Sequence, residues 1–96
     1  MLKPEGELHL DAGACQALRD RGASLLQVGI MAVSGDFEAN QAVTLLDPDG
    51  LELGRGLCSI DSQRLRSDLG EPRRSGASPV VVHRDVLVLS DRHLPQ

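Results

Sequence analysis

Short segments of alternating polar and apolar residues follow one another along the chain, separated by turn-forming residues. Residues 7–10 (ELHL) alternate strictly, which is typical of a strand with one buried face. Five further segments have the apolar character of strands: residues 28–34, 43–46, 51–57, 80–82 and 86–89. Residues 47–50 (DPDG) are a strong turn signal, so the strands on either side of them are expected to form a hairpin.

A short helix is predicted directly after the first strand. Asp11 is expected to be its N-cap, because an aspartate carboxylate readily accepts a hydrogen bond from a free backbone N–H of the first turn. The helix covers residues 12–21, and Gly22 ends it at the position where glycine is favoured. Four of its residues share one face by helical spacing: Ala14, Ala17, Leu18 and Arg21.

A second helix is predicted over residues 62–69, with Asp61 or Ser62 as its N-cap and Gly70 at its end. The pattern then amounts to about six short strands and two short helices. That combination, with its hairpin turn, predicts a mainly β fold in the form of a small mixed or open β-barrel. The chain has 96 residues, of which 41% are hydrophobic, which suffices for one domain with a single core.

Acidic and basic residues are unevenly distributed within the net charge of −4. Residues 1–50 hold eight acidic side chains against three basic ones, whereas residues 51–96 hold six acidic side chains against seven arginines. An acidic chain with a single aromatic residue argues against tight, salt-dependent nucleic-acid binding and against a row of base-stacking side chains. Four arginines gather in and after the second predicted helix: Arg64, Arg66, Arg73 and Arg74. They fit either phosphate recognition or an ordinary solvated helix face.

Catalytic and metal-binding patterns are absent from the sequence. It contains no GxGxxG, GxxxxGK[ST] or GxSxG motif, and its single lysine is Lys3. The three histidines are scattered, and none lies at metal-ligand spacing from a cysteine. The sequence therefore predicts a domain without catalytic residues and without a metal site.

Two features of the sequence bear on where the protein is located: its two cysteines and its lack of long apolar runs. Cys15 and Cys58 form no CxxC pattern and are expected to be reduced core residues. The first residues lack the apolar centre of a targeting segment, and no apolar run approaches the roughly 20 residues of a membrane-spanning helix. We therefore expect a cytoplasmic location and no membrane contact.

The loop at residues 22–30 places the apolar pair Leu25 and Leu26 between small residues. This predicts a loop whose middle docks into the core, while backbone groups stay exposed at its rim. Gly29 permits either a close approach of the backbone or a positive φ. Packing explains the segment without a ligand, and a recognition surface at its rim is the alternative.

The polar triplet His83-Arg84-Asp85 interrupts the last two apolar segments. One interpretation is a polar patch that faces a partner. The other is a strand junction braced by an ion pair of Arg84 with Asp85 or with Asp11, since charged groups are costly to bury without a partner.

Several short motifs, in order, resemble those of a PUA domain and more closely those of the C-terminal PUA domain of glutamate 5-kinases. They are Asp11-x-Gly13-Ala14, Gly22-x-Ser24-Leu25-Leu26, Gly29-Ile30, Gly35-x-Phe37, Asp47-x-x-Gly50, Gly56-Leu57 and His83-Arg84-Asp85. The resemblance implies a PUA-like pseudo-barrel of about six strands flanked by two short helices. It places the domain at residues 6–92, a linker with an added start residue at 1–5, and a tail at 93–96.

The same resemblance implies a function for the protein to which this domain belongs. A glutamate 5-kinase phosphorylates the γ-carboxylate of glutamate in the first step of proline biosynthesis, using ATP and Mg²⁺. Its catalytic residues belong to an upstream amino-acid kinase domain, which is the expected partner. The present chain is then an excised, non-catalytic accessory domain with no cofactor of its own.

PUA domains elsewhere bind structured RNA, chiefly through the loop after the first helix and the last strands. Carried over residue by residue, the RNA-contact candidates are Gly22, Ser24, Leu25, Gly29 and Arg84. Arg73 and Arg74 join them on the charge argument alone. Two alternatives to the accessory role therefore stay open: a module that binds structured RNA, and a module for self-association.

Overall fold

The computed structural model describes residues 5–69 and 79–89. Within these ranges the chain forms seven short strands, two α-helices and two 3₁₀ turns. In chain order they are β1 (Gly6–Leu10), α1 (Ala12–Arg21), β2 (Leu25–Leu26), η1 (Gln27–Gly29), β3 (Ile30–Gly35), β4 (Ala42–Leu46), β5 (Glu52–Leu57), α2 (Ser62–Leu69), β6 (Val80–Val82), η2 (Arg84–Val86) and β7 (Leu87–Leu89).

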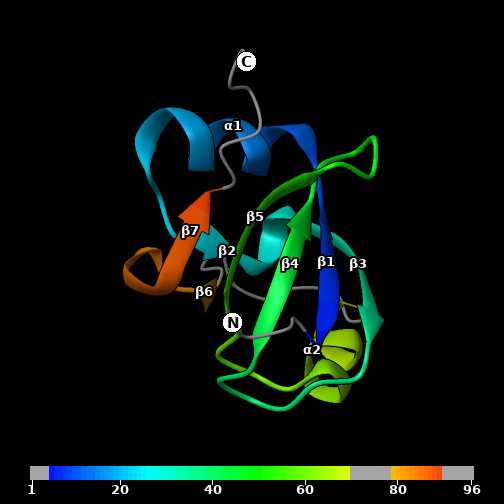
Figure 1. Ribbon diagram of the computed structural model, residues 1–96. Coiled ribbons are helices and arrows are strands. Elements are labelled where there is room, and N and C mark those ends of the chain that lie inside the picture. The colour runs from blue at the N-terminus through cyan, green and yellow to red at the C-terminus, as the bar shows by residue number, and fades with distance from the viewer. Residues whose placement is uncertain (1–4, 70–78, 90–96) are drawn as a thin grey trace.

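Five strands form a mixed sheet in the order β3-β1-β4-β5-β7, and β2 and β6 form a separate antiparallel pair. β1 lies inside the large sheet, antiparallel to β3 and parallel to β4. β4 and β5 form the predicted hairpin, and β7 adds to the outer side of β5. Figure 1 shows β2, β6 and β7 together on one side of the molecule, away from β3. The mainly β fold with two short helices is confirmed.

Both α-helices are capped as their sequences indicate. The Asp11 carboxylate accepts a hydrogen bond of 2.7 Å from the backbone N–H of Ala14, and Gly22 ends α1 at φ 61°. At α2, Asp61 accepts from the backbone N–H of Arg64 at 2.6 Å, so Asp61 is the cap. The Ser62 hydroxyl instead holds the turn before α2, because it accepts from the backbone N–H of Phe37 and donates to its carbonyl.

The core is filled from both sheets and both α-helices, which ties all layers together. Its fully buried large side chains are Leu8, Leu10, Leu18, Leu25, Val43, Leu45, Leu65, Val81 and Val82. Phe37, the single aromatic residue, is also buried and packs against the backbone of Gly6. Both thiols are free and buried, as expected.

Three predicted strands begin later than the sequence pattern indicated, one of them, 51–57, by a single residue. The segment 28–34 divides into η1 and β3, and 86–89 loses its first residue to η2. At η1 the backbone bonds leave the strand ladder, because the N–H of Gln27 donates to the Pro79 carbonyl and Gly29 accepts from the N–H of Asp11. Leu25 and Leu26, predicted as loop, pair with β6 as the short strand β2.

Two observations concern the ends of the chain and the membrane. The predicted loop 71–79 lies almost wholly outside the described residues. The proposed division into a linker at 1–5, a domain at 6–92 and a tail at 93–96 stays a prediction. Within 5–69 and 79–89, no helix is long and apolar enough to cross a membrane.

Candidate functional site

A groove of about 390 Å³ lies between α1 and the segment that follows it. One wall is the helix face predicted from the sequence, with Ala14, Ala17, Leu18 and Arg21. The other wall is the segment from Ala23 to Gly29, which includes β2 and η1. Because the helix wall is made largely of small residues, the two backbones approach closely and leave an open, mainly apolar furrow.

Gly29 sets the width of this groove. A Cβ at Gly29 would lie 2.5 Å from the Cβ of Ala14, a distance that real Cβ atoms do not adopt. The carbonyl of Gly29 also accepts a 3.0 Å hydrogen bond from the N–H of Asp11. Of the two roles expected for this glycine, close backbone approach is therefore the one that the structure requires.

The loop from Gly22 to Ser24 follows α1 and is hydrogen-bonded to Arg84, a residue far along the sequence. Gly22 adopts the left-handed conformation and its N–H donates to the carbonyl of Ala17. Two residues later, the Ser24 hydroxyl accepts a 2.9 Å hydrogen bond from the backbone N–H of Arg84, which opens η2. The fold thus brings together two of the sequence candidates that lie sixty residues apart.

The arginines of the described residues fall into two groups. Four of them pair with carboxylates: Arg19 with Asp47 at 3.9 Å, Arg55 with Glu52 at 3.3 Å, Arg64 with Asp68 at 3.5 Å and Arg66 with Asp36 at 3.3 Å. Within residues 5–69 and 79–89, Arg21 and Arg84 form no ion pair. Arg21 lines the groove, and Arg84 is exposed and bonded through its backbone N–H to Ser24.

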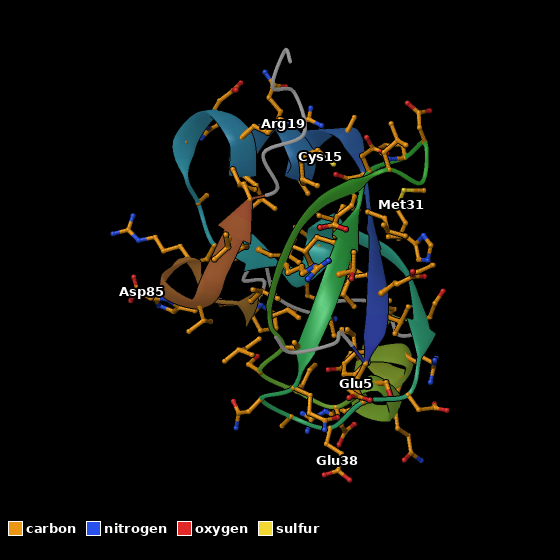
Figure 2. All side chains as sticks on the ribbon, viewed as in Figure 1. Glu5, Cys15, Arg19, Met31, Glu38 and Asp85 are labelled. Carbon is orange, nitrogen blue, oxygen red and sulfur yellow. The ribbon has the colours of Figure 1, made fainter. Side chains whose placement is uncertain are left out.

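The triplet His83-Arg84-Asp85 is braced differently from the expectation. The Nδ1 of the His83 ring accepts a 3.3 Å hydrogen bond from the backbone N–H of Asp85, whose carboxylate oxygen Oδ2 lies 3.5 Å from the same nitrogen. The predicted pairs of Arg84 with Asp85 or Asp11 are wrong for the described residues, because the 3₁₀ turn places His83 and Asp85 on the same side. Figure 2 shows Asp85 at the outer edge of this turn.

The other candidates from the sequence have different surroundings. Leu25 lines the groove but is only 1% exposed and belongs to the core. Gly29 is buried as well. Arg73 and Arg74 lie outside the described residues. Arg21 was not among the site residues predicted from the sequence, although helical spacing placed it on the face of α1 that lines the groove.

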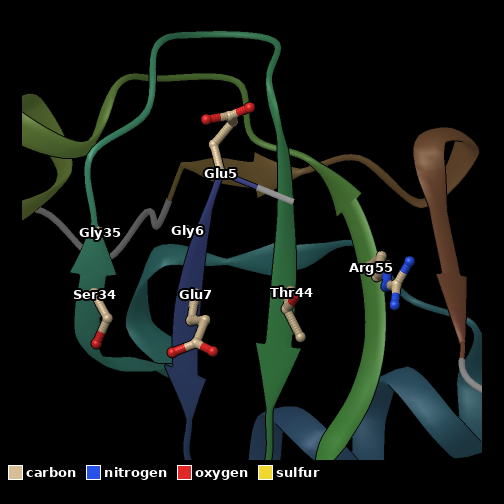
Figure 3. Close-up of a pocket in the computed structure, with 7 residues that line it drawn as sticks. All are labelled: Glu5, Gly6, Glu7, Ser34, Gly35, Thr44 and Arg55. Carbon is tan, nitrogen blue, oxygen red and sulfur yellow. The ribbon is translucent and has the colours of Figure 1, made fainter. Parts of the chain in front are cut away.

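A second, polar pocket of about 390 Å³ lies on the outer face of the large sheet (Figure 3). It is lined by Glu5, Glu7, Ser34, Thr44 and Arg55, and by two glycines. The carboxylates of Glu5 and Glu7 point in opposite directions in Figure 3, so they do not form a paired acidic site. This surface has the polar character of a solvated sheet face.

A third and wider cavity, of about 790 Å³, lies beside the start of α2. Its acidic residues are Asp36, Glu38 and Asp61. Two of them have roles in the fold, since Asp36 pairs with Arg66 and Asp61 caps α2. Among the described residues, no three His, Cys, Asp or Glu side chains are grouped so that they could hold a metal ion.

Burial raises the pKa of both thiols. For Cys58 desolvation is the main cause, and for Cys15 desolvation outweighs the opposing effect of the Arg19 charge. A thiol with a raised pKa is less often in the nucleophilic thiolate form. Both cysteines therefore have the properties of core residues, as the sequence predicted.

Comparison with known proteins identifies the domain. The family model of the PUA domain matches residues 6–69. The glutamate 5-kinase of Synechococcus sp. (strain CC9605) is 65% identical over 92 residues, which cover 96% of this chain and 26% of that protein. The glutamate 5-kinase of Prochlorococcus marinus (strain MIT 9313) is 60% identical over 88 residues, which cover 92% of this chain and 24% of that protein. The chain thus spans about a quarter of the length of these relatives.

Solved structures share the fold. A PUA domain from Aeropyrum pernix K1, in a tartrate complex, matches with a TM-score of 0.67 and 28% identity over 83% of this chain and 44% of that one. A chain of a Cbf5-Nop10-Gar1 complex matches with a TM-score of 0.69 and 18% identity over 88% of this chain and 22% of that one. The family match covers two thirds of the sequence and agrees with the observed fold. The chain belongs to the PUA domain family.

Proposed function

We propose that this chain is the non-catalytic accessory domain of a glutamate 5-kinase and acts by contact with the rest of that enzyme. The observation that carries the proposal is the 65% identity to a glutamate 5-kinase over 96% of the chain. Identity at this level over a whole domain is far above what a shared fold alone requires, since the PUA fold recurs here at 18%.

The chemistry of such a kinase belongs to the other three quarters of the protein. Phosphoryl transfer from ATP to the glutamate carboxylate needs bound Mg²⁺ and cations that hold the phosphates. The described residues do not fit that group, because they offer no three-ligand cluster and no lysine. ATP and Mg²⁺ are therefore assigned to the upstream amino-acid kinase domain, and no step of the reaction is assigned to this chain.

The proposal is tested by exchanging this domain for the matching part of a related enzyme. This chain would replace the matching 92 residues in the glutamate 5-kinase of Synechococcus sp. (strain CC9605), and ADP release would be measured with and without glutamate. We expect glutamate-dependent activity in the chimera and none in the isolated chain. Activity in the isolated chain, or an inactive chimera beside an active parent, would contradict the proposal.

A second candidate function is the binding of structured RNA at the groove. It is favoured by Arg21 and Arg84, which adjoin the loop of Gly22 and Ser24 and form no ion pair within the described residues. Guanidinium groups without a carboxylate partner among the described residues, one of them lining an open groove, suit contacts to phosphates and ribose. Arg73 and Arg74 belong to the same proposal on their charge.

The RNA candidate is tested by titrating the chain with a tRNA pool at low and at physiological salt. It predicts that Arg84→Glu and the paired Arg73/Arg74→Glu change weaken binding. The matched control is Arg64→Glu, whose side chain pairs with Asp68. The salt dependence should correspond to only a few released counterions, about 0.7–0.9 per phosphate contacted. Affinity that ignores these substitutions would exclude this surface.

A further inference from the structure

Exposed apolar side chains are concentrated in one part of the molecule. Eight large apolar residues of the described chain are more than a third exposed. Six of them belong to two short segments and are named here the apolar patch: Leu26, Val28, Val80, Val86, Val88 and Leu89. Single exposed apolar residues are normal on a protein surface, whereas a group of them marks a surface that contacts a partner.

The two segments of the apolar patch are joined by the fold. Leu26 pairs with Val80 across β2 and β6. The hydrogen bond between Ser24 and the backbone of Arg84 fixes η2 beside the same loop. β7 follows η2 directly, and Figure 1 shows it on the same side as β2 and β6. The exposed apolar residues thus come from the β2–β6 pair and from the adjoining η2–β7 segment, and in β7 Val88 and Leu89 point to opposite faces of the strand.

The backbone under the patch is tightly packed. A Cβ at Gly54 would lie 2.5 Å from the carbonyl oxygen of Val88, and one at Gly56 would lie 2.5 Å from Cγ1 of Val82. These two glycines of β5 let β7 pair closely with β5 and let Val82 of β6 pack directly against the β5 backbone. The exposed valines are therefore held on a fixed surface, which lowers the entropic cost of docking.

The charges at the margin of the patch differ from those of the whole domain. The chain carries a net charge of −4, yet Arg84 and Arg21 are the two described arginines without a carboxylate partner. The carboxylate of Asp85, the neighbouring acid, lies against the His83 ring, 3.5 Å from its Nδ1. A partner surface that is apolar in the centre and carries carboxylates opposite Arg84 would complement this side.

The composition of the patch favours a tethered partner over a free one. It contains only Leu and Val, and the single aromatic side chain, Phe37, is buried. Tight interfaces between separate proteins depend on aromatic and arginine anchors, and they must also offset the loss of free translation. A partner in the same polypeptide acts at an effective concentration of about millimolar, so a modest aliphatic surface suffices.

We infer that the apolar patch docks onto the remaining part of the parent polypeptide, with Arg84 facing a carboxylate of that part. This inference rests on the proposed function and on the length of the relatives, which extend well beyond the quarter that this chain covers. It assigns to the β2–β6–β7 side the contact through which the accessory domain is held against the kinase.

The experiment compares the accessibility of one thiol in two proteins. Val88→Cys, at a position that is 72% exposed, is labelled with a thiol reagent in the isolated chain and in the active chimera. Val86→Cys is a second probe in the patch. Met31→Cys is the matched control, since Met31 is 64% exposed and lies on the opposite side of the molecule from Asp85 (Figure 2). The native thiols are 3% and 0% exposed, so their background reaction is slow.

We expect the two patch thiols to react about tenfold more slowly in the chimera, as a docked form populated about 90% of the time requires. The control at position 31 should react equally in both proteins. Arg84→Glu, added to the chimera, should restore much of the lost reactivity at position 88.

Four outcomes would overturn the inference, and the last of them would also overturn the proposed function. Equal labelling in both proteins, with an active chimera, would exclude docking at this surface and leave the proposed function intact. Protection that appears in the isolated chain and grows with its concentration would assign the patch to a second copy. Protection that requires added tRNA would assign it to RNA. An inactive chimera would instead contradict the proposed function, and the docking inference with it.

Discussion

The central strands β1 and β4 of the large sheet bury their large aliphatic residues, whereas the β2–β6–β7 side buries Leu25, Val81 and Val82 but exposes the apolar patch. In β1 and β4, Leu8, Val43 and Leu45 are completely buried. In β7, Val88 is 72% exposed. The strands of the first region are five residues long and have partners on both sides, whereas those of the second are two or three residues long. We expect stability to depend most on the first region, and the apolar patch of the second region is the surface that we propose for contact with the rest of the polypeptide.

The largest expected effect is in the core of the sheet. Leu8→Ala should lower the free energy of unfolding by about 2–5 kcal/mol, because it leaves a cavity among fully buried neighbours. Val88→Ala should change it by less than about 0.5 kcal/mol. Urea unfolding of both variants measures the difference. Equal losses would mean that β7 carries as much of the fold as β1 does.

The next effect is at the junction of the two regions. Gly54→Ala should cost about 1–3 kcal/mol, because its Cβ would meet the backbone of β7, which must then shift. Gly13→Ala is the matched control, since its Cβ has ordinary contacts in α1 and alanine is the better helix former by up to about 1 kcal/mol. If Gly54→Ala is harmless in thermal unfolding, β7 is not held as closely as the structure indicates.

A smaller effect is expected at the groove. Asp11→Ala removes the cap of α1 and should cost about 1 kcal/mol. Asp20→Ala, in the same helix and exposed, should be nearly neutral. Chemical denaturation of the two variants gives the comparison. If the helical signal of Asp11→Ala is lost at a lower denaturant concentration than the signal of the sheet, α1 and its groove wall unfold separately from the sheet.

The smallest effect concerns pH. Burial raises the pKa of Cys58 and Cys15 above the ordinary value of 9.0. The folded protein therefore keeps these protons longer than the unfolded chain does. Stability is unaffected below pH 9 and falls as the pH rises from 9.0 through the folded pKa. Unfolding at pH 8 and pH 10 should show the decrease, and Cys58→Ala should show a shallower one; an unchanged slope would contradict the assignment.

Features that depend on a few neighbouring residues were predictable from the sequence. Asp11 with Gly22, Asp61 at the start of α2, and the turn at 47–50 each specify their structure locally, and all were confirmed. The 3₁₀ turn at 27–29 was not predictable, because it depends on the carbonyl of Pro79 and the N–H of Asp11. The parallel pairing of β1 with β4 likewise has no local signal.

The candidate site was predictable only in part. The helix face with Arg21 follows from spacing. Gly29 was expected to permit either a close approach of the backbone or a positive φ, and the structure shows the first. The hydrogen bond between Ser24 and Arg84 joins residues too distant for a pattern to connect. The apolar patch was not predictable from the sequence either, because residues 86–89 have the same apolar pattern as a buried strand. Only the sheet order shows that this strand lies at an edge.

The pairing of β2 with β6 has a consequence for the order of folding. Leu25 finds its strand partner in Val82, and the groove loop is fixed by a residue farther on still. Contacts between such distant residues form only after a long loop has closed, and the entropic cost of that closure slows folding. During synthesis, the groove and the patch cannot form until residues 80–89 have left the ribosome. The β4–β5 hairpin, whose partners are neighbours in the chain, can form much earlier.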